Sequence, residues 1–541
     1  MITHDFQLKL RVLTIISLLV SLSACVSNPL VEKGENSPNS LSNNAKNKVI
    51  AAELLKQDIE QLILNVNQIH PEAFSVFSEQ QFNQAAERIK QSIYYPMTRN
   101  EFYLRIAPLV AKLKDVHSHV GIPKDDLKLA HLNKTSSARM LFPLAVLYES
   151  DGLYVAADLS NPPNVPTGAK VLAVNDIPID FILNKMARLV AWETETGLRR
   201  KIQIEFPWLM ATLGYAGKSY TIKYRWNQRT IDKNVSAIAP VIHMQPEIQE
   251  AADKNSGETI GAEQQAEDSK QFVESQSVDS FYGYSRINQQ TVLLWFNDFY
   301  EKPARFETFL KNQFSQLSQE GVENLIIDLR YNDGGRSQNL KKLLSYITHT
   351  PIHWSYKAEI KISEQLQNLH AATTEKRRKN KFSWGLQWLP LEWTDWLQYE
   401  ISWSDAGEIV NVEFDPIQPA ERPFVGSIKV LSNGFCFSAC AAFIATVNTH
   451  QLAETIGETA GSVARVQYVY PIANLLKNSQ LKLTLPTVKV FHSDTETSRQ
   501  LAIGVSRNLV RPQVEIQRSV KQIAARHDLL LNEALKRVGQ H

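Results

Sequence analysis

Three side chains that could act as nucleophiles lie within five residues of one another, in 431-LSNGFCFSACAAF-443. They are Cys436, Ser438 and Cys440, and they stand between an apolar run and a helix-like run of small residues. A strand, a glycine-containing turn and a helix would place one side chain at a helix N-terminus, where N–H groups favour developing negative charge. Ser438 lies at the expected helix start, and Ala439 would supply an N–H donor. A serine there can also be an ordinary helix cap, so the stretch alone does not establish catalysis.

A serine nucleophile needs a base, because its hydroxyl is a weak nucleophile at its own pKa. The segment 112-KLKDVHSHV-120 directly follows an amphipathic helix and contains Asp115, His117 and His119. Either histidine could provide the base. An ordinary core or surface histidine is the simpler interpretation of each residue taken alone.

Two glycine turns favour the catalytic interpretation. The apolar run 325-LIIDL-329 leads into a turn that contains Gly334 and Gly335, at the C-terminal end of an expected strand. Such a turn can direct backbone N–H groups at an oxyanion. A further expected strand ends in 457-GETAGS-462.

The elements that would position these residues begin with helices. Apolar residues recur at helical spacing in three segments, the first of which contains Leu55, Ile59, Leu62, Val66 and Ile69. Thr98 and Glu101 form a capping box before the third segment. The pattern predicts an N-terminal helical domain over 49–125 that carries the base.

Short β-like runs such as 152-GLYVAAD-158 follow in residues 138–240. Among them, 168-GAKVLAVNDIPI-179 resembles the signature of PDZ domains, with Ala169 in place of the usual Asp and Asp176 in place of the usual Gly. The resemblance implies a PDZ-like β-domain. A β-domain without a peptide ligand is an equally open alternative.

The rest of the chain divides into an insertion and an α/β domain. Residues 245–278 are acidic and Gln-rich, which predicts a disordered insertion. Strands then alternate with helical patterns over 281–541, which indicates an α/β domain with a largely parallel sheet. Its segment 351–424 contains six of the ten tryptophans and the basic run 376-KRRKNK-381. We interpret this insertion as an aromatic cap over the sheet, with a membrane-surface contact as the alternative.

The N-terminus has the pattern of a secretory signal. Basic residues precede a short apolar run, and Leu-Ser-Ala-Cys ends at Cys25. This ending resembles the lipobox of bacterial lipoproteins, which implies a signal peptide over 1–24, lipidation of Cys25 and a polar tether over 25–48. An uncleaved anchor is the alternative. The resemblance further implies attachment to the outer membrane, facing the periplasm. Two other cysteines, Cys436 and Cys440, remain, and their pairing in a disulfide is left open.

The composition excludes some classes of partner. The 541 residues include 58 basic and 56 acidic ones, so the charge gives no reason to expect a nucleic-acid partner. His117 and His119 are too few for a metal site, and no phosphate-binding loop of the Gly-x-x-x-x-Gly-Lys type is present. We therefore expect no metal and no cofactor.

Four motifs together resemble the serine peptidase family of C-terminal processing (tail-specific) peptidases and the tricorn core. The family patterns are Asp-Gly-His-Thr, Asp-Leu-Arg-x-Asn-x-Gly-Gly, Thr-x-Ser-Ala and Gly-Glu-x-Thr-x-Gly. They correspond here, in the same order, to residues 115–118, 328–335, 437–440 and 457–461, with Cys436 in place of the usual Thr two residues before Ser438. The resemblance covers about 49–535. It implies an α/β fold of the Clp protease/crotonase-like ββα-spiral type for the catalytic domain.

The resemblance also distinguishes two branches of the family. Tail-specific members have a catalytic Lys directly after the last glycine of the fourth motif, where this chain has Ser462. The chain therefore resembles the tricorn branch, in which the histidine of the first motif is the base, and His117 matches that histidine. By the same resemblance the acid partner comes from late in the domain, and Glu496 is the candidate.

The implied mechanism is acyl transfer from a peptide to water. His117 would take the proton of Ser438, and N–H groups of Ala439 and of Gly334 or Gly335 would bind the oxyanion. The predicted function is a cell-envelope serine peptidase that hydrolyses peptides or protein tails. An inactive family member that binds an apolar ligand or a peptide is the alternative, and crotonase-like acyl-CoA chemistry is a third, weaker one.

Overall fold

The computed structural model describes most of the folded chain, namely residues 49–126, 141–239, 281–371, 403–492, 509–516 and 528–538. Cys25, the tether, the insertion at 245–278 and Glu496 lie outside the described residues, as do positions 372–402 of the Trp-rich insertion. No helix within the described ranges is both long and apolar enough to cross a membrane.

Three helices open the described chain, and they follow the predicted periodicity. They are α2 (Ala52–Ile69), α3 (Glu79–Ser92) and α4 (Arg99–Ala111). The five apolar residues predicted for the first helix are at most 1% exposed, so the helical spacing is confirmed. The capping box is confirmed as well, because Glu101 N–H donates to Thr98 Oγ1 and Thr98 N–H donates to the Glu101 carboxylate. The loop with His117 follows α4 and enters β1 (His119–Val120).

A six-stranded sheet with two helices follows. Its strands are β2 (Leu144–Glu149), β3 (Gly152–Asp158), β4 (Lys170–Val174), β5 (Ile177–Pro178), β6 (Ser219–Trp226) and β7 (Arg229–Ser236). They pair antiparallel in the order β2-β3-β4-β6-β7, with β5 on β4. The helices α6 (Ile179–Ala187) and α7 (Glu195–Thr212) pack against this sheet.

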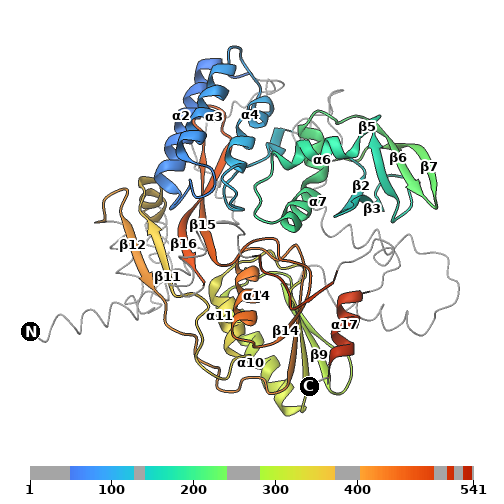
Figure 1. Ribbon diagram of the computed structural model, residues 1–541, viewed down its shortest axis with the longest axis vertical. Coiled ribbons are helices and arrows are strands. Elements are labelled where there is room, and N and C mark those ends of the chain that lie inside the picture. Colours follow the sequence, from blue (N-terminus) through green and yellow to red (C-terminus); the bar gives the residue numbers. More distant parts are fainter. Residues whose placement is uncertain are drawn as a thin grey trace, which may run out of the picture.

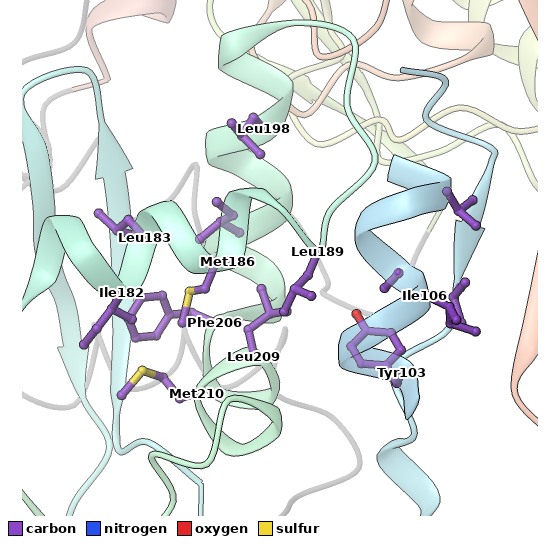
Figure 2. Packing of buried hydrophobic residues seen from close by; sticks show 14 of the residues in the cluster. Tyr103, Ile106, Ile182, Leu183, Met186, Leu189, Leu198, Phe206, Leu209 and Met210 are labelled. Atoms are coloured by element: carbon purple, nitrogen blue, oxygen red, sulfur yellow. The ribbon is translucent and has the colours of Figure 1, made fainter. Parts of the chain in front are cut away.

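The helical region and this β-sheet region share one hydrophobic core. Tyr103 and Ile106 of α4 belong to the same buried cluster as Met186 of α6 and Phe206 and Leu209 of α7 (Figure 2). All five side chains are at most 1% exposed. The loop with His117 is therefore attached at its helical end to a body that includes α7.

The α/β region contains a second six-stranded sheet in the order β17-β14-β13-β10-β9-β8. Its strands are β8 (Tyr282–Arg286), β9 (Thr291–Phe296), β10 (Asn324–Asp328), β13 (Ser427–Ser432), β14 (Glu454–Gly457) and β17 (Val514–Glu515). All pairs are parallel except β8 with β9, which agrees with the predicted parallel sheet. The helices are α10 (Pro303–Gln319), α11 (Ser337–Ser345), α14 (Ala439–Thr449) and α17 (Leu529–Arg537).

The two faces of this parallel sheet are covered by different helices. Leu294 and Phe296 of β9 join the core beneath α10, α11 and α14, whereas Leu293 and Trp295 pack with α17. This alternation follows from the two-residue period of a strand. The strand β9 is buried at every position, as expected for a strand inside a parallel sheet.

The molecule thus has two bodies, one formed by the helices α2–α4 with the antiparallel sheet and the other by the parallel-sheet region. A third sheet connects them. It contains β15 (Val466–Leu475), β16 (Lys482–Phe491), β11 (Lys357–Lys361), β12 (Ile409–Glu413) and β1. The strand β16 pairs with β15, with β11 and, at Leu483 and Thr484, with β1. In Figure 1, β15 and β16 run between the helices α2–α4 and the parallel sheet region. The segment that follows the elbow thus returns to the loop that carries His117.

Candidate active site

The nucleophile candidate Ser438 lies in a sharp turn between β13 and α14. Its backbone has φ +50° and ψ −120°, a combination that is unfavourable for a residue with a side chain. Its side chain makes no capping hydrogen bond to the helix. The ordinary role of a serine at a helix start is therefore absent. A strained residue between a strand and a helix is instead typical of an exposed nucleophile.

Two side chains from the following segment hold the peptide groups on both sides of this residue. Ser438 N–H donates to Ser462 Oγ at 2.8 Å. Gln467 Nε2 donates to the carbonyl oxygens of Ser438, at 3.0 Å, and of Val463, at 2.8 Å. Ser462, at the position where the resembled tail-specific pattern predicts a Lys, thus supplies a hydroxyl that fixes the backbone of Ser438.

The two neighbouring cysteines form a disulfide. Cys436 and Cys440 are bonded to each other, and both are fully buried. The bond spans the turn that contains Ser438. Since their sulfur atoms are bonded, neither cysteine is a free nucleophile, and Ser438 is the candidate that remains.

The glycine turn after β10 packs directly against this elbow. A Cβ at Gly334, where φ is +110°, would lie 2.9 Å from Ser438 Cβ and 3.2 Å from Ala439 N. A Cβ at Gly335 would lie 2.5 Å from the carbonyl carbon of Phe299. Only glycine allows these approaches, because every other residue would bring a carbon atom into them.

The backbone donors around Ser438 are not equivalent. Gly334 N–H already donates to Asn332 Oδ1 at 2.9 Å. For the N–H groups of Gly335 and Ala439, the described part of the chain contains no acceptor. Of the three predicted oxyanion donors, Gly335 and Ala439 are therefore the pair with a free hydrogen.

The loop with the candidate base is organised around a buried carboxylate. Asp115 is 1% exposed and accepts hydrogen bonds from Ser118 Oγ at 2.6 Å and from His117 N–H at 3.1 Å. Its oxygens also lie 3.6 Å from His117 Nδ1 and 3.5 Å from Nε2 of His70. Nδ1 of His117 thus faces a carboxylate, as a base that works through its other nitrogen requires.

The charges around this loop distinguish the two histidines. Burial raises the pKa of Asp115, but the adjacent imidazoles of His117 and His70 outweigh burial and hold the pKa well below its ordinary value. Asp115 is therefore a carboxylate at neutral pH. Burial, together with the charge of Lys201, lowers the pKa of His119 to about 3. His119 cannot take up a proton readily, which leaves His117 as the candidate base.

The second and fourth motifs hold the elbow in place. Arg200 of α7, 1% exposed, donates to both oxygens of Glu458 at 3.3 and 3.2 Å, and Glu458 Oε2 also accepts from Gly434 N–H. Arg330 pairs with Asp328 at 2.6 Å. Asp328 and Arg330 thus bind each other, and Glu458 binds Arg200 and the backbone beside the elbow, so these charges face protein groups and not a substrate.

Some residues around the site carry no sequence signal of their own. Ser462 and Gln467 hold the elbow, His70 faces Asp115, and Glu193 touches both loops. His70 and Glu193 belong to other elements, so no spacing rule links them to the motifs. The sequence drew attention to Ser462 only because tail-specific members of the family have a Lys at that position.

A cavity of about 390 Å³ lies at His70, which faces Asp115 of the loop with His117. Its lining includes His70, Glu72, Glu79 and Lys361. No residue of the elbow or of the glycine turn contributes to it. Within the described ranges, no group of three or more His, Cys, Asp or Glu residues has the arrangement of a metal site.

Comparisons with known proteins agree with the motifs. Residues 290–509 match the model of peptidase family S41, so the predicted family is confirmed. No curated protein sequence matches the chain. A crystal structure of a CPAF mutant is similar, with a TM-score of 0.60 and 16% identity over 90% of this chain and 97% of that chain. The crystal structure of mature CPAF is also similar, with a TM-score of 0.57 and 17% identity over 90% of this chain and 96% of that chain. So is the structure of mature CPAF complexed with lactacystin, with a TM-score of 0.59 and 16% identity over 90% of this chain and 97% of that chain. At these identities the likeness shows a shared fold.

Proposed function

We propose that this chain, which residues 290–509 place in peptidase family S41, hydrolyses peptide bonds with Ser438 as nucleophile and His117 as general base. The observation that carries the proposal is the backbone of Ser438. It is strained, it lacks a capping role, and it lies next to the free N–H groups of Ala439 and Gly335. Strain of this kind persists where the surrounding contacts enforce it for a function.

In the proposed reaction, Ser438 Oγ attacks the carbonyl carbon of the scissile peptide while His117 Nε2 takes the hydroxyl proton. The N–H groups of Ala439 and Gly335 donate to the oxyanion that forms. His117 then gives the proton to the leaving amine, and the C–N bond breaks to leave an acyl-enzyme. A water molecule, deprotonated by His117, hydrolyses the ester and restores Ser438.

The carboxylate that orients His117 has two candidates. Asp115 has an oxygen 3.6 Å from Nδ1 and is charged at neutral pH. Glu496, which the family resemblance indicates, lies outside the described residues and stays a prediction. Comparing Asp115→Asn with Glu496→Gln separates them, since the true partner's variant should lose roughly 100-fold or more in kcat.

A fluorophosphonate probe combined with a peptidase assay tests the proposal. The wild-type protein should be labelled and should cleave an unstructured peptide, while Ser438→Ala should do neither. His117→Ala should lose at least about 1,000-fold in kcat, because the hydroxyl then lacks its base. His119→Ala is the matched control and should stay within about tenfold. Labelling of Ser438→Ala, or equal activity of His117→Ala and wild type, would contradict the assignment.

The finer predictions extend this proposal. We expect the catalytic region to have the ββα-spiral topology of Clp protease and crotonase, and residues 138–240 to be a PDZ-like module for peptides or unfolded tails. We also expect Cys25 to carry lipid that anchors the protein in the cell envelope. Metabolic labelling with a fatty-acid analogue, compared between wild type and Cys25→Ala, tests the anchor.

The alternative of an inactive binder of apolar ligands gains no support from the described cavity. Its lining combines apolar residues such as Val66 and Phe74 with the charged Glu72, Glu79 and Lys361, so it lacks the predominantly apolar wall that such a ligand requires.

A further inference from the structure

The loop with His117 is held at Val116 by two side chains from the segment that begins α7. Val116 N–H donates to Glu193 Oε1 at 3.3 Å, and Lys201 Nζ donates to the Val116 carbonyl at 3.0 Å. Glu193 directly precedes α7, and Lys201 lies within that helix. Both polar groups of the residue beside the candidate base are thus bound by side chains from one segment.

The same glutamate also binds the segment that supports the elbow. Val463 N–H donates to Glu193 Oε2 at 2.9 Å, and the preceding residue, Ser462, accepts the N–H of Ser438. One carboxylate therefore bonds the backbone next to His117 with one oxygen and the backbone next to Ser462 with the other. Its two partners are separated by 77 and 270 residues from it in the sequence.

The segment that carries Glu193 is itself fixed to the fourth motif. Thr194 Oγ1 lies 3.0 Å from the carbonyl oxygens of both Ala460 and Gly461. Gly197 approaches so closely that a Cβ there would lie 2.1 Å from the Gly461 carbonyl oxygen. The glutamate is consequently placed by contacts that leave it little freedom to move independently of either loop.

We propose, on the basis of the function inferred above, that Glu193 is a positioning residue that sets the distance between His117 and Ser438 by joining their two supporting loops. A carboxylate suits this task because both of its oxygens accept, so two N–H groups can be bound at once. A glutamine has one accepting oxygen, and its amide nitrogen would face one of the two N–H groups. Lys201 assists from the opposite side of Val116.

The burial of the Glu193 carboxyl group supports a specific role for it. Glu193 is 9% exposed, and its charge lies near that of Asp115. A buried carboxylate next to another one is unfavourable unless hydrogen bonds compensate, so an apolar residue would serve general packing better. The retained carboxyl group fits a residue that binds two specific backbone groups.

The test compares Glu193→Gln with Glu195→Gln, a matched change on an exposed carboxylate two residues away. Small displacements of reacting groups cost up to about 100-fold, so Glu193→Gln should lower kcat roughly 10- to 100-fold with KM changed less than about threefold. Lys201→Met should lower kcat in the same direction and by less. Glu195→Gln should behave as wild type.

Amide hydrogen exchange gives a readout that does not depend on catalysis. In Glu193→Gln, exchange at both Val116 and Val463 should become about tenfold faster or more, while the core of the parallel sheet exchanges as in wild type. Unchanged exchange at the two valines would overturn the proposal. So would an unchanged kcat of Glu193→Gln, provided that the wild type is active. Faster exchange throughout the molecule, with a parallel fall in Tm, would also overturn it, because it indicates a general structural role. If the wild type has no Ser438-dependent activity, the proposed function fails, and the exchange result still decides whether Glu193 joins the loops.

Discussion

The two halves of the candidate site are built in different ways. The elbow at Ser438 is formed by neighbours in the chain and by strands of one parallel sheet, with Gly334 packed against it. The loop at His117 belongs to another body, and side chains of Glu193 and Lys201 hold it from a distance in sequence. The first half depends on backbone geometry and the second on tertiary contacts.

This difference has a consequence for mutations. A change at the elbow should alter the chemistry without releasing the fold, since the parallel sheet remains intact around it. A change in the contacts between the bodies should alter both the stability of their association and the placement of the base. Variants of the two kinds should therefore separate an effect on stability from an effect on chemistry.

Arg200→Met should have the largest effect on stability. It removes a buried cation that links α7 to Glu458 and also binds Glu149 at 3.0 Å, so two carboxylates lose this positive charge. Breaking a buried ion pair from one side destabilises by about 3 to 5 kcal/mol. Urea unfolding followed by fluorescence measures the loss, with separate transitions expected if the two bodies uncouple.

Arg199→Met is the control for this prediction. Arg199 is half-buried on the same helix and has no ion pair within the described part of the chain. It should change the free energy of unfolding by less than about 1 kcal/mol. Equal losses in the two variants would contradict the role of Arg200 as the link between the bodies.

Among changes to the residues that support the elbow, Gly334→Ala should have the largest effect on chemistry. The added methyl group would lie 2.9 Å from Ser438 Cβ and 3.2 Å from Ala439 N, so it would displace the nucleophile or an oxyanion donor. Loss of one such donor costs about 100- to 1,000-fold in kcat, or about 3 to 4 kcal/mol in the barrier. Steady-state hydrolysis of the peptide measures it.

Gly407→Ala provides a close control. Its φ of +103° is similar to the +110° of Gly334, so both alanines carry comparable backbone strain, but a Cβ at Gly407 meets nothing within 4 Å. It should therefore lose stability and keep its kcat. If Gly334→Ala also keeps its kcat, the elbow does not depend on close packing of the glycine turn.

The same division explains what could be predicted from the sequence. The strands, helices and glycine turns around Ser438 follow from local patterns, and the parallel sheet and the capping box are confirmed. The sequence could not predict which of Gly334 and Gly335 has a free N–H. The answer depends on the Asn332 side chain, which accepts the N–H of Gly334 and leaves that of Gly335 free. The role proposed for Glu193 had no local signal, since its partners are distant in sequence. Local rules thus identify the reacting residues and their elements, but they miss the distant side chains, such as Glu193 and Gln467, that hold them.

The pH dependence of stability should report the contacts between the bodies. Burial, and then the charge of Asp115, raises the pKa of Glu193 to about 7. Hydrogen bonds from Val463 and Val116 and the charge of His117 oppose this rise. The ammonium group of Lys201 also faces the Glu193 carboxyl group. A carboxyl group with a raised pKa contributes its full stability below the ordinary value and loses it as pH rises to the folded value. The wild type should therefore lose about 3 kcal/mol between about pH 4.5 and 7 that Glu193→Gln does not lose.

This effect is measured as the difference in free energy of unfolding between the two proteins at pH 5 and at pH 8. Groups common to both proteins, including Asp115 with its lowered pKa, cancel in that difference. The variant should gain relative to the wild type as pH rises. A difference that stays constant with pH would mean that Glu193 titrates as an ordinary exposed carboxyl group.

The disulfide should have the smallest effect, although it spans the nucleophile. Cys436 and Cys440 are only four residues apart, so the bond closes a short loop and contributes about 2 kcal/mol to stability. Ser438 is still held by Ser462 and Gln467 when the bond is absent. Replacing both cysteines with alanine should therefore lower kcat less than about tenfold. Dithiothreitol should have a similar effect on the wild type and none on the double variant. If reduction instead abolishes fluorophosphonate labelling while stability hardly changes, the covalent bond positions the elbow and the backbone contacts are secondary.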